Sequence, residues 1–187
     1  MKIVTIGWWN GQSNLLSAFY EYFWKNWNMG KKIHLSAIVS MSDDWRTTWK
    51  LMRAFDSELW IHLPPPGDLR RCLFSLSASK YRKHFQMLFE SLVFDEDESI
   101  RNFSIKRIFW ETIKKILKDQ KEFFSFFDEK WKRKSDEEIK EIKKIKEDFE
   151  NFSKSEFYFH IKNVLWEYID FKIPLDESIK WHKCGNL

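Results

Sequence analysis

The sequence predicts an α/β fold built on a parallel sheet, and two observations lead to this prediction. Two short apolar segments, residues 2–6 and 33–41, are rich in β-branched residues and have the composition of strands. The segment between them has the periodicity of a helix. Strand, turn, helix and strand in this order form a βαβ unit, in which the two strands run parallel.

The first strand ends at Gly7, and helical periodicity starts at Ser13 and ends near Trp24. The apolar stripe of this helix consists of Leu15, Leu16, Phe19, Tyr22 and Phe23. The second strand, at 33–41, is almost continuously apolar. Such a run is typical of a parallel strand that is buried on both faces.

The rest of the chain is mainly helical or loop-like. A polar loop at 42–49 precedes a short helix at 50–55, and a proline-marked loop spans 62–73. Residues 78–165 are rich in Lys, Glu and Phe with helical periodicity, which indicates a helical insertion or cap. Inside it, a capping box at Ser135 leads into an apolar stripe. The stripe consists of Ile139, Ile142, Ile145, Phe149 and Phe152.

These elements predict a Rossmann-like, three-layer parallel sheet with a helical insertion. We expect three parts: a βαβ nucleotide-binding part at 1–77, the insertion at 78–165, and a return to the sheet domain at 166–187. The 32 basic and 28 acidic residues give a net charge of +4 and are interleaved, which argues against a nucleic-acid partner. No apolar run is long enough for a signal peptide or a membrane span, and two distant cysteines suit a reducing cytoplasm.

Four loops are candidate sites: 7–13, 42–49, 64–71 and 181–187. The first two follow predicted strands, and open α/β sheets bind ligands beyond the carboxyl ends of their strands. A loop that leads into a helix also offers an anion its free N–H groups. Glycine in such a loop lets the backbone approach a phosphate closely.

Charged residues in these loops suggest ligand contacts. Asp43, Asp44 and Asp68 are candidate ligands for a hard cation or a hydroxyl group. Arg70 and Arg71 are candidate anion clamps. Taken singly, each Asp is more simply a helix N-cap and each Arg a surface charge. As a set near strand ends, they predict a ligand site. A zinc site at the tail is rejected, because the His and Cys spacing fits no structural zinc pattern.

Four segments resemble the CofD/YvcK family, which carries GGGTGxSxLL, AIVTVxDDGGSSGxLR, PPGDIRxCLxAL and GHxxGNL in this order. In this chain they read GWWNGQSNLL, AIVSMSDDWRTTWKLM, PPGDLRRCLFSLS and WHKCGNL. The resemblance covers roughly residues 1–77 and 178–187. The DD-x-x-[ST]-[ST] and PPGD forms look like the YvcK branch, the gluconeogenesis-factor type.

The resemblance implies a cytoplasmic protein that binds a nucleotide-linked metabolite of the UDP-sugar type and regulates gluconeogenesis or cell shape. In that interpretation the first and last loops hold phosphates through backbone N–H groups. The implied ligand-binding positions are Gly7, Trp8, Trp9, Asn10, Gly11, Ser13, Asp43, Asp44, Gly67, Arg70, Arg71, His182, Gly185 and Asn186.

The CofD branch implies a different activity, that of a 2-phospho-L-lactate transferase. Such an enzyme moves a phospholactyl-type group from a guanosine carrier to a deazaflavin acceptor. Asp68 would be the catalytic residue that positions the acceptor hydroxyl, and Asp44 with Asp68 would bind Mg²⁺. The resemblance leaves open both the choice between enzyme and regulator and the existence of a homo-oligomer.

Tryptophan replaces the family's glycine repeatedly. Trp8, Trp9, Trp45, Trp49 and Trp181 occupy such positions, and Trp60 precedes PPGD where the family often has glycine. Glycine occurs only 5 times, where average usage of ~7% would give about 13. Tryptophan occurs 11 times. These residues follow no helical or strand period, which disfavours an aromatic core or stacking platform. We hypothesise that UGA codons, glycine in one variant genetic code, were translated as tryptophan.

Two expectations follow for the chain as written. Indoles at Trp8 and Trp9 would fill the space that phosphates need, so it should not bind the family's ligands. The family's domains also continue beyond the GHxxGNL motif, whereas this sequence stops at Leu187. We therefore expect a C-terminally truncated sheet with an unpaired edge and an uncovered face.

Overall fold

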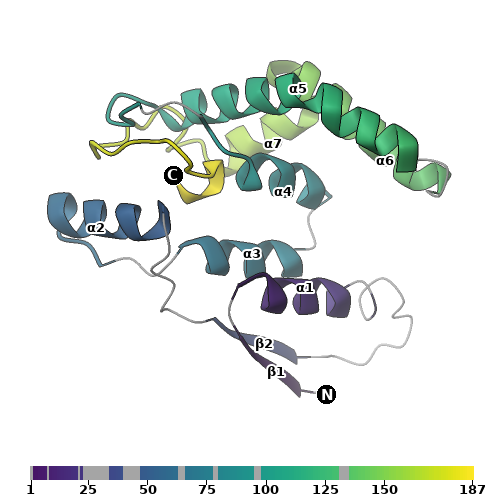
Figure 1. The fold of residues 1–187 in the computed structure, drawn as a ribbon, viewed down its shortest axis with the longest axis horizontal. Coiled ribbons are helices and arrows are strands. Elements are labelled where there is room, and N and C mark those ends of the chain that lie inside the picture. The colour runs from purple at the N-terminus through teal and green to yellow at the C-terminus, as the bar shows by residue number, and fades with distance from the viewer. Residues whose placement is uncertain are drawn as a thin grey trace. The chain divides into compact units, whose positions relative to one another are not determined.

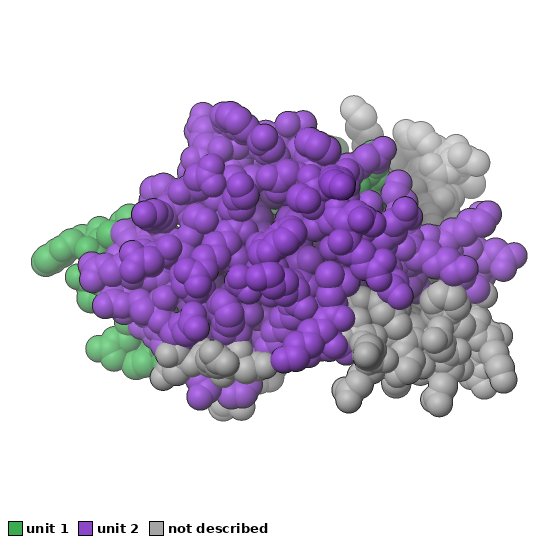
Figure 2. Space-filling model, turned by 90° about the horizontal axis from the view of Figure 1, so that it is seen from above, with its two compact units in different colours: residues 1–82, 186 green, residues 83–185, 187 purple. Residues whose placement is uncertain are grey.

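The computed structural model describes residues 2–7, 9–20, 22, 34–39, 47–62, 66–77, 80–94, 98–130 and 135–187. Within these ranges, the side chains of residues 9, 10, 47, 68, 120–130 and 138 are not described. The chain divides into two compact units, coloured separately in Figure 2. The first comprises residues 1–82 and Asn186, and the second residues 83–185 and Leu187. The predicted three-part division stays a prediction.

The first unit is built on a parallel pair of strands. β1 (Lys2–Gly7) pairs with β2 (His34–Val39) in a register that sets Lys2 opposite His34 and Gly7 opposite Val39. Helices α1 (Trp9–Phe19) and α3 (Pro66–Leu76) lie on the same side of this sheet, and α2 (Thr47–Leu59) precedes α3 (Figure 1). The predicted mixed α/β class with parallel strands is confirmed.

The two strands have one covered and one open face. Odd-numbered residues, such as Thr5, are at least partly buried on the helix side, whereas even-numbered residues are exposed. Val4, Ile6 and Ile38 are 61%, 79% and 54% exposed. The prediction that the second strand is buried on both faces is therefore wrong for this chain. The described helices cover only one face, although the strand's composition would suit two.

Two helix predictions for this unit also need correction. The first helix begins at Trp9 instead of Ser13, and Leu15 and Tyr22 of its predicted stripe are exposed. The predicted proline-marked loop at 62–73 is wrong from Pro66 onward, where α3 begins. Proline is favoured at the first helical position because its missing N–H has no partner there in any case. The predicted end at Trp24 lies outside the described residues.

The second unit is mainly helical. It contains most of α4 (Arg82–Glu90), α5 (Ile105–Lys130), α6 (Asp136–Glu150), η3 (Phe152–Lys154) and α7 (Glu156–Val164). Helix α6 begins directly after Ser135, and Ile145, Phe149 and Phe152 of the predicted stripe are buried. At α7, Ser155 caps the helix by accepting the Tyr158 N–H at 3.0 Å.

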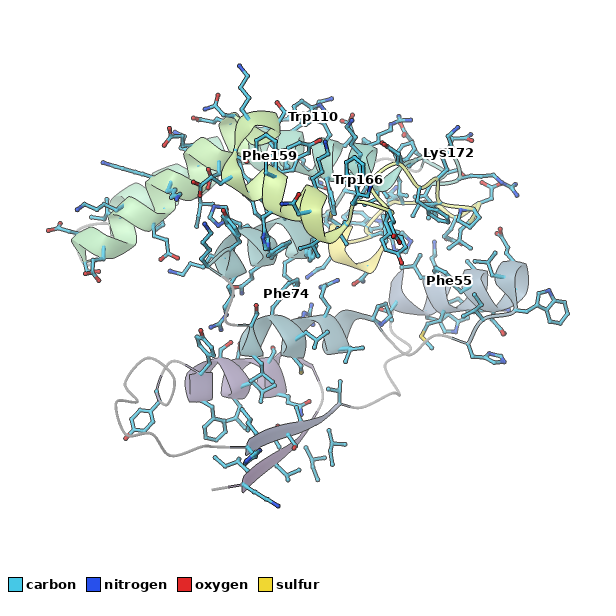
Figure 3. All side chains as sticks on the ribbon, turned by 180° about the vertical axis from the view of Figure 1, so that it is seen from behind. Phe55, Phe74, Trp110, Phe159, Trp166 and Lys172 are labelled. Carbon is cyan, nitrogen blue, oxygen red and sulfur yellow. The ribbon has the colours of Figure 1, made fainter. Side chains whose placement is uncertain are left out.

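An aromatic cluster forms the centre of the second unit. Phe157 is fully buried, and its ring centroid lies 4.8 Å from that of His84, 5.2 Å from Phe85 and 5.9 Å from Phe149. Burial of such large rings contributes to the stability of this unit. In contrast, Trp110 and Trp166 lie at the surface (Figure 3).

The chain's last segment packs along an earlier one within the second unit. Isolated bridges join Ser104 to Lys172, Ser99 to Ser178 and Leu92 to Lys183. The short helix η4 (Cys184–Asn186) follows. Among the described helices, none is both long and apolar enough to cross a membrane.

A buried pair of polar side chains joins α4 to α6. The His84 Nε2 lies 2.8 Å from the Asp148 Oδ2, and both side chains are buried. Burial lowers the pKa of His84 below its ordinary value of 6.5, although the hydrogen bond and charge of Asp148 oppose this shift. Below pH 6.5 the folded state thus binds fewer protons than the unfolded state.

We therefore predict that the second unit loses stability as the pH falls through 6.5. The variant His84→Gln keeps a donor toward Asp148 but does not titrate, so its free energy of unfolding should vary less between about pH 7 and pH 5. The unsubstituted chain should show the steeper fall in stability over this range. Urea unfolding followed by circular dichroism measures it. His34→Gln is the control, because His34 is exposed. If the free energy of unfolding changed equally with pH in the unsubstituted chain and in both variants, the prediction would be contradicted.

Candidate functional site

The candidate site lies in the first unit, where strands end and helices begin. β1 ends at Gly7 and α1 begins two residues later. The first turns of α2 and α3 are neighbours, because a methyl group added at Gly67 would lie 3.8 Å from the Thr48 hydroxyl oxygen. Each helix start carries backbone N–H groups without helical acceptors. Starts of this kind attract anions through those groups and the helix dipole.

The carboxamide of Gln12 connects four parts of this unit. Its Nε2 lies 3.3 Å from both the Thr5 carbonyl oxygen and the Thr5 Oγ1, and 3.0 Å from the Ile38 carbonyl oxygen. The Cys72 thiol of α3 donates to its Oε1 at 3.8 Å. Gln12 is only 4% exposed. One side chain of α1 thus bonds to β1, β2 and α3, and we call it the Gln12 clasp.

Gly7 lies close to the side chain of Gln12. A methyl group added at Gly7 would lie 3.3 Å from the Gln12 Cβ, closer than most real contacts, and Gln12 would have to shift. At Gly11, by contrast, an added methyl group would meet nothing within 4 Å. The sequence predicted both glycines as phosphate-approach residues. The structure adds that Gly7 makes room for the clasp.

Arg70 connects the third predicted loop to the last one. It lies in α3, is 7% exposed, and donates a hydrogen bond from its Nη1 to the Asn186 Oδ1. Asn186 belongs to the first unit. Two residues that the sequence assigned to one ligand site are therefore in contact. A buried guanidinium group needs such acceptors, because an uncompensated buried charge is costly.

Polar side chains are unusually common among the buried residues of this unit. Ser17 donates to Ser75 at 3.0 Å across the α1–α3 contact, and Arg82 donates to Ser17 at 3.2 Å. Such groups are buried at a cost unless they are hydrogen-bonded, so a concentration of them marks a site where specific geometry matters. Among the side chains described for this unit, the buried polar ones are Thr5, Gln12, Ser13, Thr48, Arg70 and Ser75.

Some predicted site residues cannot be placed. Trp8, Asp43 and Asp44 lie outside the described residues, and Trp9, Asn10 and Asp68 are described by their backbone alone. No group of three or more His, Cys, Asp or Glu side chains that could hold a metal occurs among the described residues. The Mg²⁺ site at Asp44 and Asp68 therefore stays a prediction.

The remaining predicted residues have different surroundings. Arg71 is half-buried in α3, and its carbonyl oxygen accepts the Ser75 hydroxyl at 2.9 Å. His182 and Gly185 belong to the second unit. The His182 side chain is fully buried, and its backbone carbonyl accepts the Val93 N–H at 3.0 Å. Its predicted role as a ligand-binding residue stays a prediction.

Sequence reasoning missed Gln12, Thr48 and Cys72 as parts of this site. One signal was present for Gln12, because it precedes the buried Leu16 by four residues and so shares its helix face. A polar residue on a buried face calls for partners. Those partners, on two strands and another helix, could not be read from local spacing.

Comparisons of the chain with models of protein families, with curated proteins and with solved structures gave no match.

We predict that Gln12→Met destabilises the first unit by about 1–3 kcal/mol. Methionine has a similar length, but it leaves the Thr5 and Ile38 carbonyl groups without this donor. Amide hydrogen exchange in β2 should therefore accelerate, while exchange in α6 of the second unit should not. Asn14→Met is the matched control, since Asn14 is exposed on the same helix. Unchanged exchange in β2 of Gln12→Met would contradict the role of the clasp.

Proposed function

We propose that this chain is a YvcK-like protein that binds a nucleotide-linked metabolite of the UDP-sugar type at the carboxyl edge of its sheet. One observation supports this most: residues from all four family-like segments meet in the first unit. Gln12 contacts Ile38 and Cys72, and Arg70 contacts Asn186. Segments far apart in sequence would not need to converge if each were only a surface loop.

We assign each of these groups a role in binding the nucleotide-linked ligand. The N–H groups after Gly7 and at the start of α3 would hold the phosphates. The positive charge of Arg70 would balance the diphosphate, with Asn186 fixing the direction of the guanidinium group. Asp43, Asp44 and Asp68 would bind hydroxyl groups or Mg²⁺. No step in this proposal requires a covalent reaction, which suits a regulatory protein of the cytoplasm.

We also propose that the sheet of the first unit is Rossmann-like. A Rossmann-like sheet has helices on both faces and further parallel strands. The exposed Val4, Ile6 and Ile38 are where a second helix layer would pack. Apolar side chains on that face are otherwise in contact with water, which costs roughly 25 cal/mol for each Å².

A ligand titration tests the proposal. We predict that the double variant Trp8→Gly, Trp9→Gly binds a UDP-sugar in calorimetry, whereas the chain as written binds it weakly or not at all, because glycine lets the backbone approach the diphosphate. A matched control is Trp110→Gly, whose indole lies in the second unit. The alternative, a CofD-like transferase, predicts binding of a guanosine carrier together with a deazaflavin instead. No gain for either ligand class in the double variant would reject the proposed site.

A further inference from the structure

Two described residues other than glycine have a positive φ, and both are tryptophan. Trp60 has a φ of 56° and Trp181 a φ of 68°. Positive φ is uncommon for any residue with a Cβ, and for a bulky one it is a genuine outlier. Tryptophan makes up only 11 of the 187 residues, so chance would rarely place it at both positions.

Trp60 ends helix α2 at a position that glycine normally occupies. Its N–H bonds to the Asp56 carbonyl oxygen at 3.2 Å, directly after the last helical residue, Leu59. This bond and the positive φ define the αL motif, whose left-handed residue is usually glycine. The indole is 89% exposed, so burial does not offset the cost of this conformation.

Trp181 lies in a tight turn with the same requirement. The His182 N–H bonds to the Ile179 carbonyl oxygen at 3.0 Å, and the positive φ falls on the third residue of this four-residue turn. A type II turn has this pattern and calls for glycine or asparagine at that place. The indole is 57% exposed, and the Lys180 ammonium lies 5.9 Å from its centroid, the limit of a cation–π contact.

The two positions are independent, because one ends a helix in the first unit and the other forms a turn in the second. Both indoles are more than half exposed, at 89% for Trp60 and 57% for Trp181. The same chain has 5 glycines and 11 tryptophans, the reverse of ordinary usage. A single cause that converts glycine into tryptophan accounts for the backbone and for the composition together.

We infer that positions 60 and 181 are glycine positions of this fold, and that the native polypeptide carries glycine at both. The codons at both positions are then UGA, which the cell of origin reads as glycine. The sequence of this chain carries tryptophan there because UGA was translated with a different genetic code. Backbone geometry and composition alone carry this inference. The inference therefore does not depend on the proposed function. Expression in a host that reads UGA differently yields a strained or shortened chain.

The backbone part is tested by comparing glycine with alanine at each position. Both substitutions remove the indole, so their difference isolates the conformational preference. We expect Gly to raise the folding equilibrium constant about fivefold over Ala at positions 60 and 181. Trp166 is the matched control, since it is 67% exposed but lacks a positive φ. There Ala should equal or exceed Gly. Ala equal to or better than Gly at 60 and 181 would overturn the inference.

The coding part is tested on the gene and on the protein from its own cell. UGA at codons 60 and 181, with glycine in the corresponding peptides by mass spectrometry, is the expected result. UGG at either codon, or tryptophan in either native peptide, would overturn it.

Discussion

The Gln12 clasp is the interaction on which the first unit depends. In the part of the chain that the structure describes, the sheet has only two strands, and both carry exposed side chains on one face. The backbone hydrogen bonds between two strands alone give such a pair little stability. The Gln12 carboxamide joins the ends of both strands to α1 and, through Cys72, to α3. One buried side chain therefore connects both strands, α1 and α3.

The two units are stabilised by different kinds of contact. The second has a core of aliphatic and aromatic residues around Phe157, with His84 and Asp148 as a buried polar pair. The first buries hydroxyl, carboxamide and guanidinium groups, whose energy depends on direction. Directional contacts fix geometry more than they add stability, which suits a binding site.

Local patterns predicted the elements with regular periodicity. The strand of residues 2–6 and the stripe of α6 could be read from the sequence because each buries one face with its own period. Helix α3 was missed because its Pro-Gly start also marks loops. The Gln12 partners were missed because they lie 7, 26 and 60 residues away. The meeting of Arg70 with Asn186 was predicted only through the resemblance of their segments to one family.

We propose that these strand ends and helix starts form an anion-binding edge that Gln12 organises. The most direct measurement is a nuclear magnetic resonance titration of the Trp8→Gly, Trp9→Gly protein with a UDP-sugar, observed at backbone amides. We expect saturable chemical-shift changes at the amides of Gly7, Gly11 and Gly67, and smaller changes when Gln12→Met is added. Shifts confined to α5, α6 and α7, or none at all, would contradict it.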